Sequence, residues 1–242
     1  MSRRTTAIAA ALSVLALGSP LMTGCANPLA TQYLIQGVEK YEVGNYQGAI
    51  ADYDKGIGIN PQYANAYYNR GIAKYDLKDY QGAIADYTKA IEIDPQYVSA
   101  YYNRAYAKHD SKDYQGAIAD FNKAIAINPQ FANAYTSRGA TKSQLKDYQG
   151  AIADYTKAIE INPKNSNAYN NRGLAKSNLK NYQGAIADYD KALVINPQSA
   201  DAYENRGIAR ELVGDLKGAC VDWRIAADLG YERSAAWVKI QC

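Results

Sequence analysis

Histidine is almost missing from this chain of 242 residues, which contains only His109. A metal site built from several imidazoles, or a histidine working with a second imidazole base, is therefore excluded. A Gly-rich phosphate loop and a Gly-x-Ser-x-Gly nucleophile elbow are also absent. The carboxylates recur at even intervals, so an acid/base pair cannot be told apart from a solvated face. We therefore predict that the protein is not an enzyme, with no catalytic residue, metal, cofactor or small-molecule substrate, and we expect His109 to be a surface or groove side chain.

A surplus of charge of one sign is missing as well. The formal net charge is +3. Arg3 and Arg4 lie in a segment that we expect to be removed, and residues 1–24 contain no acid, so the charge from Cys25 onward falls to +1. Proteins that bind nucleic acid or anionic membrane surfaces usually carry a basic patch or stripe. The nearly balanced charge therefore predicts that the protein binds neither nucleic acid nor an anionic membrane surface through a basic patch.

No apolar run in the sequence is long enough for a transmembrane helix, which needs about 20 apolar residues. The longest run, at 7–17, follows Arg3 and Arg4 and is interrupted at 18–20 by glycine, serine and proline. A positive start followed by a short apolar stretch is typical of an export signal. We predict that residues 1–24 are such a signal.

The end of this segment, Leu-Met-Thr-Gly-Cys at 21–25, resembles a bacterial lipobox. Thr23 and Gly24 fit that pattern, whereas Met22 stands where leucine is usual. The resemblance implies that Cys25 is lipidated and becomes the N-terminus, with residues 25–29 as a short tether, and that the protein is exported and membrane-anchored in the periplasm or at the cell surface. The alternative is an ordinary secretory signal with a coincidental cysteine.

Cysteine is scarce: beside Cys25 there are only Cys220 and Cys242. An even number of remaining thiols in an exported protein makes a disulfide plausible. Cys220 takes the position that isoleucine fills in the other repeats, so we expect it to be buried. A bridge to Cys242 would pin the terminal helix to the last repeat. The alternative is a buried cysteine acting as a small apolar side chain, with a free terminal thiol.

A repeat runs through nearly all of the rest of the chain. Tyr-Gln-Gly-Ala-Ile-Ala-Asp-Tyr stands at 46–53, 80–87, 148–155 and 182–189, with variants at 114–121 and 216–223. Successive copies are 34 residues apart, and a period of this length is typical of a solenoid whose units bury their apolar faces by stacking. Such proteins usually act as surfaces that hold partners.

Each unit reads as two helices. In the unit 64–97 we expect a first helix over 64–77, a short turn at 78–79 and a second helix over 80–93, which ends before Pro95 because proline cannot continue a helix. Ala83, Tyr87 and Ala90 recur at steps of three and four residues and so share one helix face.

These features resemble the tetratricopeptide repeat family. The matching residues in this unit are Tyr67, Gly71, Tyr80, Ala83, Tyr87, Ala90 and Pro95. The resemblance implies an all-α, right-handed superhelical solenoid in a single domain, with a capping helix at 234–242 behind the repeats. The six repeats would cover 30–63, 64–97, 98–131, 132–165, 166–199 and 200–233.

One departure from the family pattern concerns an arginine in the first helix, where leucine is usual. It recurs in every repeat but the first, which has Gln36, and an aspartate recurs in every second helix. We predict a ladder in which each aspartate pairs with the arginine of the following repeat, since the first repeat has no predecessor. Pairing within a repeat would leave Gln36 unexplained, and the ladder leaves Asp222 without a partner. Its predicted members are Asp52, Arg70, Asp86, Arg104, Asp120, Arg138, Asp154, Arg172, Asp188 and Arg206.

The family resemblance also implies a concave groove, lined by first helices, that binds an extended peptide or a helix. Tyrosine offers a large contact area at low entropic cost, so we predict that a partner segment with apolar or aromatic anchors docks on the aromatic part of this lining. The alternative is that these are ordinary amphipathic surface residues. The predicted lining is Tyr41, Tyr68, Ile72, Tyr75, Tyr102, Tyr106 and His109.

The predicted function is a non-enzymatic, lipid-anchored scaffold that binds a protein or peptide and assists the assembly of a cell-envelope complex. The envelope role is an analogy with other tetratricopeptide lipoproteins. The alternative is a soluble secreted or self-associating interaction protein without the anchor.

Overall fold

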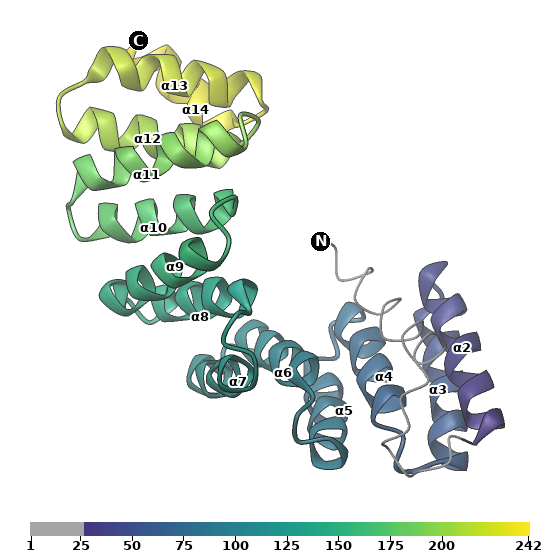
Figure 1. The fold of residues 1–242 in the computed structure, drawn as a ribbon. Helices are drawn as coiled ribbons and strands as arrows, with labels where there is room; N and C mark the ends of the chain where they lie inside the picture. Colours follow the sequence, from purple (N-terminus) through teal and green to yellow (C-terminus); the bar gives the residue numbers. More distant parts are fainter. Residues whose placement is uncertain (1–26) are drawn as a thin grey trace. The chain divides into compact units, whose positions relative to one another are not determined.

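The computed structural model describes residues 27–242, which fold into thirteen α-helices with no strand among them (Figure 1). The predicted export signal and Cys25 lie outside the described residues. None of the helices within the described part is long and apolar enough to span a bilayer. In chain order the helices are α2 (Pro28–Glu42), α3 (Tyr46–Ile59), α4 (Ala64–Asp76), α5 (Tyr80–Ile93), α6 (Val98–Asp110), α7 (Tyr114–Ile127), α8 (Ala132–Gln144), α9 (Tyr148–Ile161), α10 (Ser166–Asn178), α11 (Tyr182–Ile195), α12 (Ala200–Leu212), α13 (Leu216–Asp228) and α14 (Glu232–Gln241).

The helices form consecutive helix-turn-helix pairs, as predicted for an all-α repeat fold. They divide into two compact units, unit 1 up to Ile127 and unit 2 from Asn128, with three pairs in each. The last helix, α14, stands outside the pairs at the predicted place of the capping helix. That all six repeats form one continuous domain stays a prediction.

The first helix begins earlier than predicted. Residues 25–29 were expected to be a tether, but α2 starts at Pro28. The side chain of Asn27 accepts a hydrogen bond from the backbone N–H of Leu29 at 3.0 Å, and proline is tolerated in the first helical turn because its missing N–H would have no partner there. The N-terminal cap therefore extends the helix into the expected tether.

The turn inside each hairpin has the same construction. The second helix is capped by a side chain such as Asp79, which accepts from the backbone N–H of Gly82 at 2.9 Å. The residue before this cap has a positive φ, which is 80° at Gly44 and 88° at Gly214 but also 64° at Lys78. A non-glycine residue in this left-handed region costs free energy. The lysine in each of the four central turns therefore lowers the stability of the fold. The other three of these lysines are Lys112, Lys146 and Lys180.

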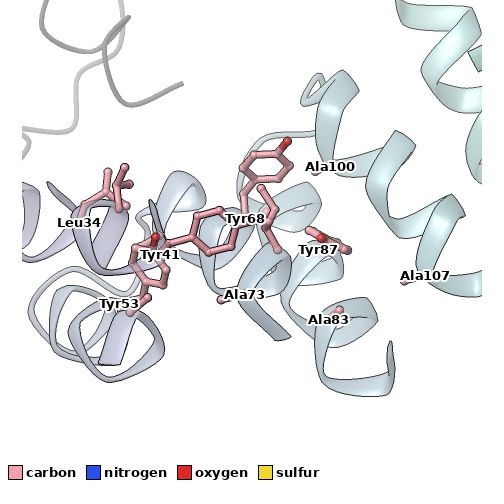
Figure 2. Close-up of a cluster of buried hydrophobic side chains, with 14 of the residues drawn as sticks. Leu34, Tyr41, Tyr53, Tyr68, Ala73, Ala83, Tyr87, Ala100 and Ala107 are labelled. Carbon is pink, nitrogen blue, oxygen red and sulfur yellow. The ribbon is translucent and has the colours of Figure 1, made fainter. Parts of the chain in front are cut away.

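The core of unit 1 consists of large rings set among small residues (Figure 2). Tyr53, Tyr68 and Tyr87 are each 1% exposed, and the alanines beside them, such as Ala83, are fully buried. Gly71 of α4 leaves room for the ring of Tyr87, since a Cβ there would stand 2.7 Å from Cε1. Packing of a ring against a small residue holds the two helices of a hairpin together.

Unit 2 repeats this design within each hairpin, and neighbouring hairpins pack on one another in both units. Ala192 and Leu193 of α11 pack with Ala202 of α12, which is fully buried. The alanine early in the first helix therefore packs on the second helix of the preceding repeat.

Candidate protein-interaction surface

Three of the seven residues predicted to line a groove are core residues. Tyr41 is 8% exposed, Tyr68 1% and Ile72 5%, and all three belong to the apolar core of unit 1 (Figure 2). The prediction that they offer open contact area is wrong. The positions lie on the side of the first helix that packs against the neighbouring helices, and aromatic character alone does not distinguish that side from the open one.

Tyr68 shows how thoroughly such a residue is used for packing. Its ring centroid lies 5.9 Å from that of Tyr87 and 4.9 Å from that of Tyr97. Its hydroxyl oxygen accepts a hydrogen bond from Nδ2 of Asn103, in the next repeat, at 2.9 Å. Burial raises the pKa of Tyr68 to about 12, against smaller opposite effects of hydrogen bonds with Ser99 and Asn103. Tyr68 thus joins repeats two and three.

The other four predicted groove residues are partly exposed and lie on α4 and α6. The Tyr102 and Tyr106 hydroxyls are 3.3 Å apart, and both rings lie edge-on to Phe121 at 5.8 Å. The His109 ring lies 5.2 Å from that of Tyr114. We call Tyr75, Tyr102, Tyr106 and His109 the aromatic patch.

Tyrosine hydroxyls also link neighbouring first helices, which the sequence reasoning missed. Tyr41 of α2 donates to Asp76 at the end of α4, and Tyr75 of α4 donates to Asp110 at the end of α6. Both pairs are 35 residues apart, one residue more than the repeat length. That offset is the signal that could have revealed them. Burial, followed by the bond to Asp76, raises the pKa of Tyr41.

The predicted ladder between repeats is wrong, because each arginine pairs with the aspartate of its own repeat. Arg70 Nε lies 2.9 Å and Nη2 2.5 Å from the carboxylate oxygens of Asp86. A residue 16 positions further on lies directly across the hairpin, so the two helices of one repeat bring the charges together. The equivalent pairs are Arg104–Asp120, Arg138–Asp154, Arg172–Asp188 and Arg206–Asp222.

A second cation completes each pair. Lys74 Nζ lies 2.8 Å from Asp86, and in the last repeat Arg210 Nη1 lies 2.9 Å from Asp222. Asp222, which the ladder would have left alone, is therefore paired twice. The lysines at the equivalent position are Lys108, Lys142 and Lys176.

The arginine does reach the preceding repeat, but by a different contact. Arg70 Nη1 donates to Asp54 at 2.5 Å, Arg104 Nη1 to Thr88 at 2.9 Å and Arg206 Nη1 to Asp190 at 2.6 Å. The first repeat has no predecessor, which accounts for Gln36 without the predicted ladder. There Asp52 pairs with Lys40 at 2.5 Å and Lys55 at 3.1 Å. Burial alone would raise the pKa of Asp52, but the two lysines outweigh it and lower the pKa.

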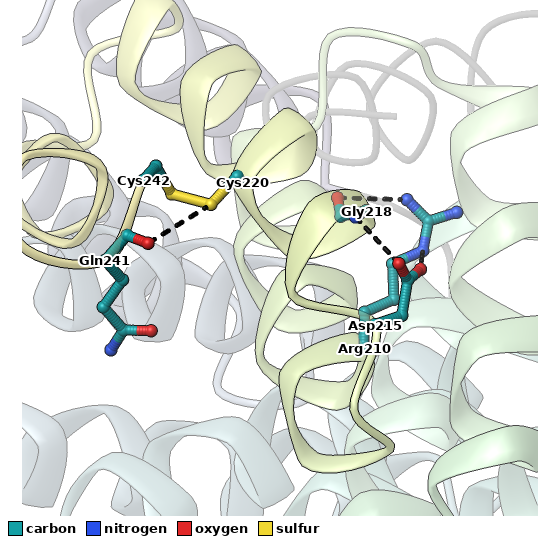
Figure 3. Close-up of a disulfide and its surroundings, with 6 residues drawn as sticks. All are labelled: Arg210, Asp215, Gly218, Cys220, Gln241 and Cys242. Carbon is teal, nitrogen blue, oxygen red and sulfur yellow. Dashed lines mark hydrogen bonds and ion pairs between the residues drawn. A yellow bond between two sulfur atoms is a disulfide. The ribbon is translucent and has the colours of Figure 1, made fainter.

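The end of the chain is fastened to the last repeat. Cys220 of α13 and Cys242 are joined by a disulfide with their Cα atoms 5.7 Å apart (Figure 3). The ring of Trp237 on α14 lies 5.1 Å from that of Trp223, which is fully buried. The bridge that the sequence left open is therefore present, and α14 covers the outer face of the last hairpin.

Within 27–242 no group of three or more histidine, cysteine, aspartate or glutamate side chains is placed to hold a metal ion. The buried aspartates of the second helices, such as Asp86, are each paired with two cations. Their arrangement suits a structural role.

A sequence model of the tetratricopeptide repeat matches residues 64–97, 98–131, 132–165 and 166–199, more than half of the chain. A second model, described as a TPR repeat, matches 37–78. The four matches of the first model coincide with the predicted repeat boundaries in the middle of the chain. No curated protein sequence matches the chain.

Solved structures share the fold. MamA, known from a crystal structure, has 29% sequence identity to this chain, with a TM-score of 0.64 over 68% of this chain and 96% of that chain. YrrB, a TPR protein with an unusual peptide-binding site, is 22% identical, with a TM-score of 0.63 over 77% of this chain and 97% of that one. PilF of Pseudomonas aeruginosa is 17% identical, with a TM-score of 0.75 over 88% and 98%. At such low identity the last two show the fold alone.

Proposed function

Because the chain belongs to the tetratricopeptide repeat family, we propose that it is a non-enzymatic scaffold that binds a protein partner through a peptide or helical segment. Repeat proteins of this kind are generally interaction surfaces and not catalysts. YrrB, which shares the fold, is described as a TPR protein with an unusual peptide-binding site, and we propose a peptide partner by analogy with it. Membership of a family does not identify the partner. The kind of partner must be argued from the residues of a binding site.

The proposal rests on a difference between two kinds of position in the first helix, those that are buried and constant and those that are partly exposed and variable. Packing positions repeat almost unchanged, as at Ala66 and Ala100, which are both fully buried. The partly exposed positions differ between repeats: Tyr75 becomes His109 in the next repeat and Ser143 in the one after. Partly exposed positions that vary between repeats are the candidates for recognition, and in unit 1 they form the aromatic patch.

We further propose that the protein is exported and anchored through a lipid on Cys25, and that it assists assembly of an envelope complex in the periplasm or at the cell surface. The support is the lipobox-like sequence at 21–25. Since α2 begins at Pro28, a lipid on Cys25 would hold the first helix within roughly 10 Å of the bilayer, at about 3.3–3.6 Å per residue.

Crosslinking in intact cells tests the partner site. A photoreactive amino acid replaces Tyr106 in the aromatic patch or, as a control, Tyr182 in unit 2, and crosslinked proteins are identified by mass spectrometry. We expect a partner captured at 106 and not at 182, and lost with Tyr102→Ala while the helical content is retained. Equal capture at both positions would argue against the patch.

The anchor is tested separately with Cys25→Ala, which should move the protein from the membrane fraction to the soluble fraction. Unchanged membrane association would favour a different anchor and leave the partner site untouched.

Self-association by end-to-end stacking, the alternative raised by the repeats themselves, is disfavoured at the first helix. The position that stacks on a preceding repeat is a fully buried alanine in the later repeats, such as Ala66 and Ala202, but in α2 it is Gln32, which is exposed. A long polar side chain there obstructs the close approach of another repeat.

A further inference from the structure

The last repeat is covered by α14 through contacts that are specific as well as apolar. The hydroxyl of Ser234 donates to Oε2 of Glu204 at 2.8 Å, and the guanidinium of Arg233 pairs with the same carboxylate. Arg233 also lies over the ring of Trp237, with Cζ 5.3 Å from the centroid. The helix thus presents a cation, a hydroxyl and an aromatic ring to α12 and α13.

Glu204 dictates which kind of segment can lie on this face. It is 2% exposed. Its carboxylate is bound by Arg233 and Ser234, which both lie at the start of α14. A buried carboxylate without a cation is strongly unfavourable. The surface formed by Glu204, Cys220 and Trp223, which we call the cap site, therefore selects a segment that carries a positive charge.

The hold of α14 on the cap site depends heavily on the disulfide. The helix has ten residues, and helices shorter than about 12–15 residues are marginal on their own. Ser234 is its only fully buried residue, and Ile240 is 78% exposed. The disulfide between Cys220 and Cys242 closes a segment 22 residues apart in sequence, and a bridge of this span favours the closed form by about a hundredfold.

We propose that the cap site binds an amphipathic helical segment that carries an arginine and a nearby aromatic residue, and that α14 occupies this site until a dithiol reduces the disulfide.

The exposed Cys242 is the point of attack. The thiolate of the reductant bonds to the Cys242 sulfur, and Cys220 leaves as a thiolate that takes up a proton. The second thiol of the reductant then displaces the Cys242 thiol and closes the reductant's own disulfide. This site lies within unit 2 and is additional to the proposed partner site.

Release of α14 can be measured without any partner. Trp223 and Trp237 are the only tryptophans in the chain, so tryptophan emission reports directly on the contact between α13 and α14. The full chain with Cys25→Ala retains only the two cysteines of interest. We expect reduction, or Cys220→Ser with Cys242→Ser, to shift this emission to the red while helical content and the melting of the repeats remain.

Binding is then measured with a labelled peptide of residues 231–241. We expect at least tenfold tighter binding to the reduced chain than to the oxidised one, and at least a tenfold loss with Glu204→Gln or with Arg233→Glu in the peptide. Glu204→Gln keeps the shape and the hydrogen bond with Ser234, so folding persists. Unchanged tryptophan emission on reduction, equal peptide affinity in both redox forms, or indifference to Glu204→Gln would each overturn the proposal.

Discussion

Gly173 of α10 lies against the ring of Tyr189 so closely that a Cβ on it would stand 2.7 Å from Cε1. Because Tyr189 is 1% exposed, its ring cannot move aside without disturbing the core. We expect Gly173→Ala to lower the free energy of unfolding by about 1–3 kcal/mol, as overpacking does. Gly58→Ala is the control: among the described residues, nothing beyond its own stretch of helix lies within 4 Å of its Cβ position, so the better helix propensity of alanine should stabilise by up to about 1 kcal/mol. Urea denaturation of both variants decides the matter.

The two aspartates that contact Arg70 should differ in importance. Asp86 is 4% exposed and pairs with Arg70 and Lys74, so Asp86→Asn removes the buried anion that both cations share, and we expect a loss of about 3–5 kcal/mol. The Asp54 side chain is 54% exposed, and Asp54→Asn should cost less than about 1 kcal/mol. The measurement is thermal or urea unfolding of both variants. Comparable losses would show that the contact to the preceding repeat matters as much as the pair within the repeat.

These charges also show how far the sequence predicts the molecule. Helix ends follow from local signals: Pro95 and the preceding Asp94 predict the end of α5 at Ile93, where the structure has it. The partner of Asp86 does not follow, because Arg70 and Arg104 recur at the same period as the aspartate, and only the packing distance of the helices distinguishes them.

The same limit applies to the predicted groove. Tyr68 and Tyr75 are both tyrosines of the first helix, yet Tyr68 is 1% exposed and Tyr75 is partly exposed. The difference depends on Tyr97 and Tyr87, whose rings close over Tyr68. A periodic pattern identifies a helix face, but the depth of each residue depends on the side chains that meet it from other elements.

Asn69 is a buried amide without a hydrogen-bonding partner among residues 27–242. It is 2% exposed, and neither Nδ2 nor Oδ1 is paired within this part of the chain. The equivalent Asn103 donates to Tyr68, but the first repeat has Leu34 at the position of Tyr68. We expect Asn69→Leu to stabilise the protein by about 1–3 kcal/mol by removing an unsatisfied amide. Asn103→Leu is the matched control and should destabilise, so stabilisation by both changes in a urea titration would contradict the argument.

The lysines in the hairpin turns offer a second route to higher stability. Lys146 has a φ of 62°, in the left-handed region where a Cβ costs roughly 1–2 kcal/mol. We expect Lys146→Gly to raise the free energy of unfolding by about 1 kcal/mol, since the strain relieved exceeds the extra entropy of an unfolded glycine. Gly214, with a φ of 88°, allows the reverse experiment: Gly214→Lys should destabilise by a similar amount. Thermal unfolding measures both.

Alkaline pH should destabilise unit 1 through Tyr68, whose pKa burial raises from 10.0 to about 12. In the unfolded chain the hydroxyl ionises near its ordinary pKa, whereas in the folded chain it keeps its proton to a higher pH. The stabilisation linked to this proton is therefore fully present below pH 10 and is lost as the pH rises from about 10 to 12. Two pKa units correspond to roughly 3 kcal/mol.

Tyr68→Phe cannot ionise, so its unfolding free energy should fall less steeply over this range than that of the unaltered protein. The control is Tyr33→Phe, at a partly exposed position of α2. If Tyr68→Phe instead shows the same dependence on pH as the control in urea titrations, another buried tyrosine carries the effect.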